Sequence, residues 1–403
     1  MSMTKLTMTN PQNVADSTLL QEQTRYVDKH LPSLTISKQQ WITLVVAVLF
    51  SRTVFYALGL IGTHAYNPET VVNIDIWQQV CRFDCMWFQR IADDGYALFP
   101  TYMKGGNAAN WAFMPVSPLL GKLMALLVRD TNLALVLVSN LTFVLSVAVF
   151  LKALKQLSFS EEMQDIAIWL LCFSPYAVYA MSGYSEPLYI ALISGVFIAC
   201  YRQNWWAVGM LGLVAAITRN LGVMLVFSVL IVGFQAYGAS SFYRLKNNAL
   251  SVIAAIWLIP LGFFSYMAYL HFHMGDALAF GHIQIAWGRE FSNPIEWLVY
   301  GVKTGGAKLY LVLVSLIGFA LNAYLFVKKR YAEATFMLIN LLIPLSSGVN
   351  AMPRYIFGLY PTYLAIMLLL ERYPKARMPT LLTGAAISTF FVIGFYSNVF
   401  FTV

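Results

Sequence analysis

The stretch Cys81–Tyr96, CRFDCMWFQRIADDGY, holds three acidic residues in a chain that contains few. They are Asp84, Asp93 and Asp94, and they follow the first strongly apolar segment. Ionisable side chains are costly near a membrane, so their presence there is by default a sign of a functional site. A carboxylate held at a membrane edge could act as a general base and take a proton from a hydroxyl group.

Asp84 has two interpretations. Trp87, Phe88 and Ile91 follow it at helical spacing, which predicts an amphipathic helix in the membrane interface that begins at Asp84. An acid at the start of a helix often caps it, so Asp84 could be structural. The functional interpretation makes Asp84 the general base.

The other acids have similar alternatives. Asp93 and Asp94 precede Gly95-Tyr96, which is typical of a helix end, so a solvated turn explains them as well as a substrate contact does. A paired-acid metal site is a further alternative, but two adjacent acids alone are a weak signal. Glu186 precedes a proline, which fits the first turn of a helix, so Ser185 or Glu186 could cap the following span.

Three arginines are candidates for binding phosphate. Arg219 and Arg354 each lie where one apolar run meets the next, and Arg289 lies in a later loop. The planar guanidinium donates paired hydrogen bonds to phosphate, so three such groups around one cavity would suit the phosphate of a lipid carrier. The alternative for each is an arginine that extends to the membrane interface.

The four cysteines indicate no metal site. Cys172 and Cys200 lie in apolar runs, where cysteine is usually a small core residue. Cys81 and Cys85 are spaced to share a helix face. That spacing permits a disulfide, but we do not expect one.

These groups must be positioned by membrane-spanning helices. The 403 residues are 59% hydrophobic and 11% charged, with a mean hydropathy of +0.66. Soluble domains are about one quarter charged. The chain holds many apolar runs of roughly 17–25 residues, the length that crosses a bilayer. We therefore expect an all-α polytopic membrane protein, and we interpret the net charge of +8 as a topology signal and not as a nucleic-acid site.

Twelve apolar runs are candidate spans. They lie near 41–62, 113–128, 132–151, 162–182, 186–201, 205–218, 221–237, 249–272, 306–327, 332–349, 355–370 and 379–400. The run 113–128 is short and holds Lys122 and two prolines, which favours a re-entrant or juxtamembrane helix. With eleven spans, more than half of the 26 basic residues lie on the cytoplasmic side together with the N-terminus.

The predicted organisation is one integral domain. A polar cytoplasmic arm, 1–40, precedes the membrane domain, 41–403, which has long external loops at about 63–130 and 274–305. This topology places the polar motifs at one face. The residues we expect to contact substrate there are Arg82, Asp93, Asp94, Tyr96, Tyr184, Glu186, Gln284, Trp287 and Tyr355.

Six motifs in order carry a family resemblance. They read RFD…IADDGY, FMPVSPLL, FSPYAVYAMSGYSEPLY, WWAVGMLGLVAAITRNLGVMLV, GDALAFGHIQIAWGRE and NAMPRYIFGLYP, from about Arg82 to Pro361. In this order they resemble the PIG-V-type mannosyltransferases of the GT-C glycosyltransferase superfamily.

The resemblance implies an inverting transfer of a sugar, usually mannose, from a polyprenyl-phosphate donor. It implies a catalytic aspartate in the first external loop, which maps onto Asp84, and it implies no required metal or other cofactor. We expect a lipid, glycan or protein acceptor at the external face of a bacterial inner membrane. The alternative is a transporter or flippase of lipid-linked saccharides, although we see neither the internal repeats nor the broken helices typical of transporters.

Overall fold

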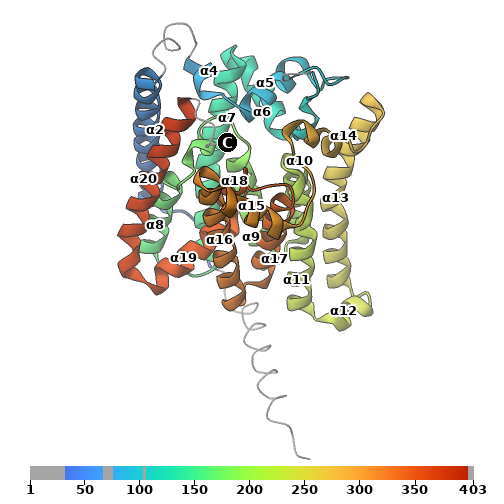
Figure 1. Cartoon of the computed structure of the whole chain (residues 1–403). Helices are drawn as coiled ribbons and strands as arrows, with labels where there is room; N and C mark the ends of the chain where they lie inside the picture. The colour runs from blue at the N-terminus through green and yellow to red at the C-terminus, as the bar shows by residue number, and fades with distance from the viewer. Residues whose placement is uncertain (1–31, 67–75, 103–105, 398–403) are drawn as a thin grey trace, which may run out of the picture.

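The computed structural model describes residues 32–66, 76–102 and 106–397, which fold into helices with no strand among them (Figure 1). Their single β-bridge joins Tyr102 to Ala108. Most of the predicted arm, 1–40, lies outside the described residues. The first described helix, α2, begins at Lys38.

Six helices in the described part of the chain are long and apolar enough to cross a membrane. They are α2 (Lys38–Tyr66), α7 (Thr131–Gln156), α11 (Leu225–Tyr237) with the preceding turn η3 (Asn220–Met224), α13 (Asn247–Met274), α16 (Gly306–Val327), and α20 (Arg377–Tyr396) with η5 (Pro374–Ala376). Shorter helices pack among them. These are α8 (Glu161–Cys172), α9 (Glu186–Tyr201), α10 (Trp205–Thr218), α17 (Tyr331–Leu345) and α19 (Tyr360–Arg372). The chain is thus a multi-pass helical membrane protein, and its predicted total of eleven spans stays a prediction.

Short helices lie at both ends of the bundle and also near its middle. The remaining elements are α4 (Ile76–Val80), α5 (Asp84–Asp94), η1 (Asn110–Ala112), α6 (Val116–Val128), η2 (Ala177–Ala180), α12 (Ala239–Tyr243), α14 (Ala279–His282), η4 (Ile283–Trp287), α15 (Pro294–Thr304) and α18 (Met352–Phe357). Figure 1 shows α4, α5, α6 and α14 at one end of the bundle and α12 at the other. Helix α6, from the run set aside as a non-crossing helix, packs against α5 and α7.

Helix α5 has the boundaries and the buried face that its sequence predicts. It begins at Asp84 and ends before Gly95, whose φ of 82° is readily adopted only by glycine. Trp87, Phe88 and Ile91 are buried, so the helix lies with its apolar face on the protein. Asp84 does not cap this helix, because the preceding residue holds the cap position and no side chain caps it.

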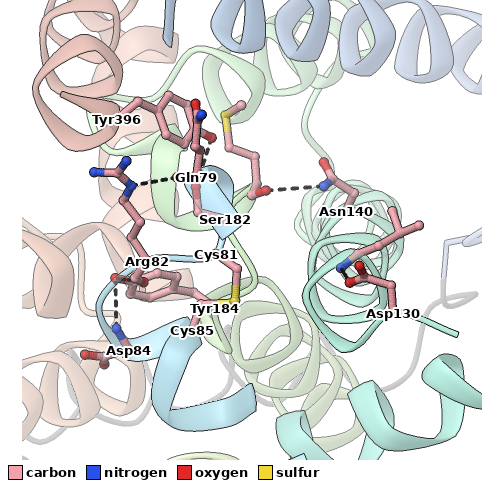
Figure 2. Close-up of a disulfide and its surroundings, with 12 residues drawn as sticks. Gln79, Cys81, Arg82, Asp84, Cys85, Asp130, Asn140, Ser182, Tyr184 and Tyr396 are labelled. Atoms are coloured by element: carbon pink, nitrogen blue, oxygen red, sulfur yellow. Dashed lines mark hydrogen bonds between the residues drawn. A yellow bond between two sulfur atoms is a disulfide. The ribbon is translucent and has the colours of Figure 1, made fainter. Parts of the chain in front are cut away.

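Cys81 and Cys85 form a disulfide, so the prediction that they stay unpaired is wrong (Figure 2). The prediction assumed that both residues lie on one helix. Cys81 instead lies in a bend before α5, and Phe83 between them has a positive φ of 55°. This turn brings the two Cα atoms to 5.0 Å, within the range of natural disulfides.

Polar side chains inside the bundle support the non-helical segment between α8 and α9. Arg52, buried in α2, donates to the Asn140 side chain at 2.8 Å and to the Ala180 carbonyl at 3.2 Å. The Tyr56 hydroxyl donates to the Met181 carbonyl at 2.9 Å. Backbone groups that leave a helix at membrane depth need such partners, because no water is available to them. These bonds fix the segment that leads into α9.

Candidate active site

Two acids and two arginines form one alternating chain of ion pairs. Arg354 Nη1 lies 2.6 Å from Asp84 Oδ2, and Arg354 Nε lies 2.5 Å from Glu186 Oε1. Arg219 Nη1 donates to the same Glu186 oxygen. The order is therefore Asp84, Arg354, Glu186, Arg219. Residues far apart in the sequence meet here, as their predicted placement at one face requires.

Four different elements supply these groups. Asp84 is the first residue of α5, and Glu186 lies in the first turn of α9, where a negative charge is favoured by the helix dipole. Arg219 follows α10 in extended backbone and Arg354 lies in α18. Each residue lies at or near a helix end, so the site forms where helices begin or end.

Asp84 is the most exposed of the four residues in the ion-pair chain. Its side chain is 21% exposed, against 12% for Arg354, 13% for Arg219 and 5% for Glu186. Burial alone would lower the pKa of Arg354, but the adjacent Asp84 and Glu186 carboxylates raise that pKa well above its usual value. Arg354 is therefore always charged, and Asp84 is the group that an incoming molecule can reach.

Tyrosines surround both arginines. The Arg354 guanidinium lies over the rings of Tyr184, 4.6 Å from the centroid, and Tyr179, 5.5 Å away. Arg219 lies over Tyr189 and Tyr355 in the same way. Such contacts stabilise a cation that has lost its water. Tyr355 and Tyr184, both predicted to contact substrate, thus belong to the site because their rings contact the arginines.

Tyr184 also contacts the backbone of Asp84, the candidate base. Its hydroxyl lies 3.4 Å from the Asp84 backbone nitrogen and 3.4 Å from the Arg82 carbonyl (Figure 2). Burial and the nearby Asp84 carboxylate raise the pKa of Tyr184 well above its usual value, so the hydroxyl keeps its proton. The Arg82 side chain points away from Asp84 and donates to the Gln79 carbonyl at 3.0 Å.

The predicted third phosphate ligand lies elsewhere. Arg289 donates to Gln284 at 2.9 Å in the second loop and does not join the ion-pair chain. Trp287, from the same loop, packs edge-on against Trp87 at 5.5 Å, one turn along α5 from Asp84. The second loop therefore reaches the helix of the candidate base through an aromatic contact and not through its arginine.

The remaining predicted residues shape the first loop. Asp93 accepts a hydrogen bond of 2.6 Å from Thr131, which starts α7, and Asp94 is exposed beside it. The Tyr96 hydroxyl donates to the Phe113 carbonyl at 2.7 Å. These contacts fit the solvated-turn interpretation of the acids, and direct substrate contacts for them stay a prediction.

Sequence reasoning missed Tyr179 and the disulfide. Tyr179 lies in the quoted motif FSPYAVYAMSGYSEPLY, five residues before Tyr184 in the sequence, but nothing in the motif indicates that η2 places both rings against Arg354. The cysteine pair had a visible signal, because both residues flank the predicted base. The sequence did not show that the backbone bends before α5, and this bend brings the two cysteines together.

The part of the chain that the structure describes shows no metal cluster, and the cavity beside Glu186 is small. In the described ranges, no group of three or more His, Cys, Asp or Glu side chains could hold a metal ion. A cavity of about 20 Å³ lies beside Glu186, large enough for a single water molecule. A larger cavity, of about 420 Å³, is lined by Trp41, near the start of α2, and Lys152, near the end of α7. It is therefore separate from this site.

A family model decides the identity of the chain. The model described as mannosyltransferase (PIG-V) matches residues 68–310, more than half of the sequence. The chain belongs to the PIG-V mannosyltransferase family. The match includes three members of the ion-pair chain, Asp84, Glu186 and Arg219, while Arg354 lies beyond it. The comparison with curated protein sequences finds no match.

The chain is similar in fold to a solved structure. ArnT from Cupriavidus metallidurans, bound to undecaprenyl phosphate, is 16% identical with a TM-score of 0.50 over 87% of this chain. An oligosaccharyltransferase from Archaeoglobus fulgidus, in complex with zinc and sulfate, is 13% identical with a TM-score of 0.45 over 88% of this chain. This PIG-V chain spans 64% of the ArnT chain and 53% of the archaeal one.

Proposed function

We propose that this PIG-V family member transfers a sugar, mannose by family, from a polyprenyl-phosphate donor to an acceptor hydroxyl. Asp84 is the general base, the anomeric carbon is inverted, and the phospholipid is the leaving group. The observation that carries the proposal is the ion-pair chain, which joins Asp84, its most exposed member, to two half-buried arginines through Arg354 and the buried Glu186. The candidate base and the candidate phosphate ligands are thus held in one site through Arg354.

The shared guanidinium couples the two halves of this reaction. Arg354 divides its donors between Asp84 and Glu186. When Asp84 takes the acceptor proton, its carboxylate becomes neutral and attracts Arg354 less strongly. At the same moment the leaving phosphate gains a negative charge, which Arg354 and Arg219 can then stabilise. Catalysis comes from such preorganised charges that meet the charge developing in the transition state.

The donor class is supported by the fold and by the membrane setting. ArnT, which has the same fold, is bound to undecaprenyl phosphate in its structure. A polyprenyl tail would lie in the bilayer beside the helices, and its phosphate would meet the arginines at the helix ends. Guanidinium groups are suited to phosphate oxygens. We propose the same class of carrier here, with a lipid, glycan or protein as acceptor.

The proposed site faces outward. Helix α5, which begins with Asp84, lies at the end of the bundle where α4, α6 and α14 also cluster (Figure 1). Arg244 and Lys246 follow α12 at the opposite end, which fits a cytoplasmic face by the positive-inside rule. We therefore propose a bacterial inner-membrane enzyme with a cytoplasmic N-terminus and its active site on the external side.

Replacing Asp84 tests the reaction. Asp84→Asn keeps the size of the side chain but cannot accept the proton, so transfer should fall about 10²- to 10⁴-fold, the usual contribution of a general base. The assay measures mannose transfer from polyprenyl-phosphate [³H]mannose by purified protein in nanodiscs. Membranes of a deletion strain supply the acceptor, and mass spectrometry of the product identifies it.

The matched control is Glu162→Gln, which alters an exposed ion pair with Arg377 away from the site. This variant should transfer at the wild-type rate. Wild-type transfer by Asp84→Asn would rule out the general-base role. Movement of intact mannosyl lipid across the membrane with no cleavage of its sugar–phosphate bond would replace the proposal with a flippase.

A further inference from the structure

The Cys81–Cys85 disulfide closes a small ring that contains the candidate base. Phe83 and Asp84 lie between the two cysteines, and Phe83 has a positive φ of 55°, which a residue other than glycine rarely adopts. Cys81 is 1% exposed and Cys85 is 0% exposed. The backbone that begins α5 therefore cannot change direction without moving a buried covalent link.

The disulfide also rests on the segment that holds Arg354. A Cβ atom placed on Gly183 would lie 2.2 Å from Cys85 Sγ, so the sulfur packs directly on that glycine. The next residue, Tyr184, contacts the Asp84 backbone nitrogen through its hydroxyl and lies beneath the Arg354 guanidinium. One sulfur atom thus touches the turn that sets both partners of the Asp84–Arg354 pair.

The pairing is specific. The other two cysteines, Cys172 and Cys200, are buried and free. Asp84 lies inside the ring that the Cys81–Cys85 pair closes, whereas the free cysteines lie within α8 and α9. They provide a matched comparison for any loss of a cysteine.

We propose that the Cys81–Cys85 disulfide is a positioning element for Asp84 and that the protein is active only in the form that carries it. This inference rests on the proposed function, because it takes Asp84 as the base. A group displaced by about 1 Å from its productive position can lose about 10²-fold in rate. The disulfide holds Asp84 against such a displacement.

The chemistry requires a partner of known class. Cys81 and Cys85 begin as thiols, and they lose two electrons and two protons as their S–S bond forms. A disulfide of a thiol oxidant accepts these electrons and protons, and its own S–S bond breaks to give two thiols. Such oxidants act in external compartments and not in the cytosol. Because both sulfurs are buried, this exchange must occur before the first loop packs on the turn at Gly183.

Mass spectrometry tests whether the Cys81–Cys85 disulfide is present. In a Cys172→Ala/Cys200→Ala background only the pair remains. This full-length protein, denatured in the presence of an alkylating maleimide, should gain no adduct, and after a phosphine reductant it should gain two. Two adducts without reductant would show free thiols and overturn the inference. This measurement needs no sugar transfer, so it stands or fails independently of the proposed function.

The positioning role is tested by kinetics. Cys81→Ser/Cys85→Ser should lower kcat for mannose transfer about 10- to 100-fold and leave KM for the donor unchanged, because the arginines still bind the phosphate. Cys172→Ala/Cys200→Ala should keep the wild-type kcat. An unchanged kcat in the serine variant would overturn the inference.

A third measurement covers the case in which the serine variant does not fold. Because the folded protein hides both sulfurs, wild-type protein is produced in cells grown with increasing amounts of a membrane-permeant thiol reductant, and the reduced fraction of the purified protein is read by maleimide mass after denaturation. Activity should fall in proportion to that fraction. Full activity in reduced protein would sink the positioning role alone, whereas an oxidised protein that never transfers sugar would sink the proposed function.

Discussion

At the residue scale, Glu186 is the centre of the site. One of its oxygens accepts hydrogen bonds from both Arg219 and Arg354, and its side chain is 5% exposed. Two buried cations this close would repel each other if the carboxylate between them were neutral. Glu186 therefore keeps the two arginines together in the absence of a phosphate group. The sequence placed Glu186 at a helix start but could not show this shared bond.

Glu186→Gln should destabilise the protein. The amide keeps the shape of the side chain but leaves Arg219 and Arg354 without their shared negative charge. Removing one partner of a buried ion pair costs about 3–5 kcal/mol. The free energy of unfolding, measured by denaturant titration in detergent micelles, should fall by that order.

The control for this change is Glu162→Gln. Glu162 is 70% exposed and pairs with Arg377, so its replacement should cost about 1 kcal/mol or less. Equal losses in the two variants would mean that the buried carboxylate does not hold the arginines.

At the element scale, the segment between α8 and α9 determines how the site is built. It carries Tyr179 and Tyr184 to Arg354 and presents Gly183 to the disulfide. Its backbone is satisfied by side chains of α2 and α7, with Arg52 as the most deeply buried donor. Helices of the bundle thus position the site indirectly, through an irregular segment packed between them.

Gly183→Ala should destabilise this segment more than a glycine-to-alanine change that introduces backbone strain but no crowding. Gly183 has a φ of 78°, and an added Cβ would lie 2.2 Å from Cys85 Sγ. Gly95 has a φ of 82° with nothing within 4 Å of the added atom. Strain should cost both alanine variants about 1–2 kcal/mol. Crowding should cost Gly183→Ala roughly 1–3 kcal/mol more.

Thermal unfolding of the two glycine variants in the same detergent checks this difference. If Gly95→Ala lost as much stability as Gly183→Ala, the contact between Gly183 and the Cys85 sulfur would not contribute to stability.

Helices were more predictable than the turns between them. Apolar runs and the spacing of Trp87, Phe88 and Ile91 predict elements, because burial of a helix face follows a regular period. The bend at Cys81 and the positive φ of Phe83 depend on a disulfide and on packing from distant segments, which no local pattern encodes. Asp84 was predictable as a residue, whereas its pairing with Arg354 required the fold.

At the scale of the whole molecule, charge and shape agree on an orientation. Helices α4, α5, α6 and α14, from the two loops that we propose to be external, lie at one end, and α12, which Arg244 and Lys246 follow, lies at the other (Figure 1). The matching of the two ends to the two sides of a membrane is a testable proposal. It also bears on the disulfide, which needs an oxidising compartment.

Single cysteines introduced at exposed positions should report the orientation. Glu290→Cys in the second loop should react with a membrane-impermeant maleimide in intact cells, and Ser240→Cys in α12 should react only after permeabilisation. The native free cysteines, Cys172 and Cys200, are buried and should contribute little background. The reverse labelling pattern would place the site in the cytoplasm.

The sequence separations in the ion-pair chain have a consequence for biogenesis. Arg219 follows Glu186 by 33 residues, whereas Arg354 follows it by 168. Helices α9 and α10 pack together, and both charges lie at the same end of this hairpin. As the ribosome delivers the chain, the hairpin can therefore enter the bilayer with its carboxylate already neutralised by Arg219. The catalytic centre is completed only when α18 has been synthesised, so a nascent chain inserts most of its membrane domain before it can act on any lipid.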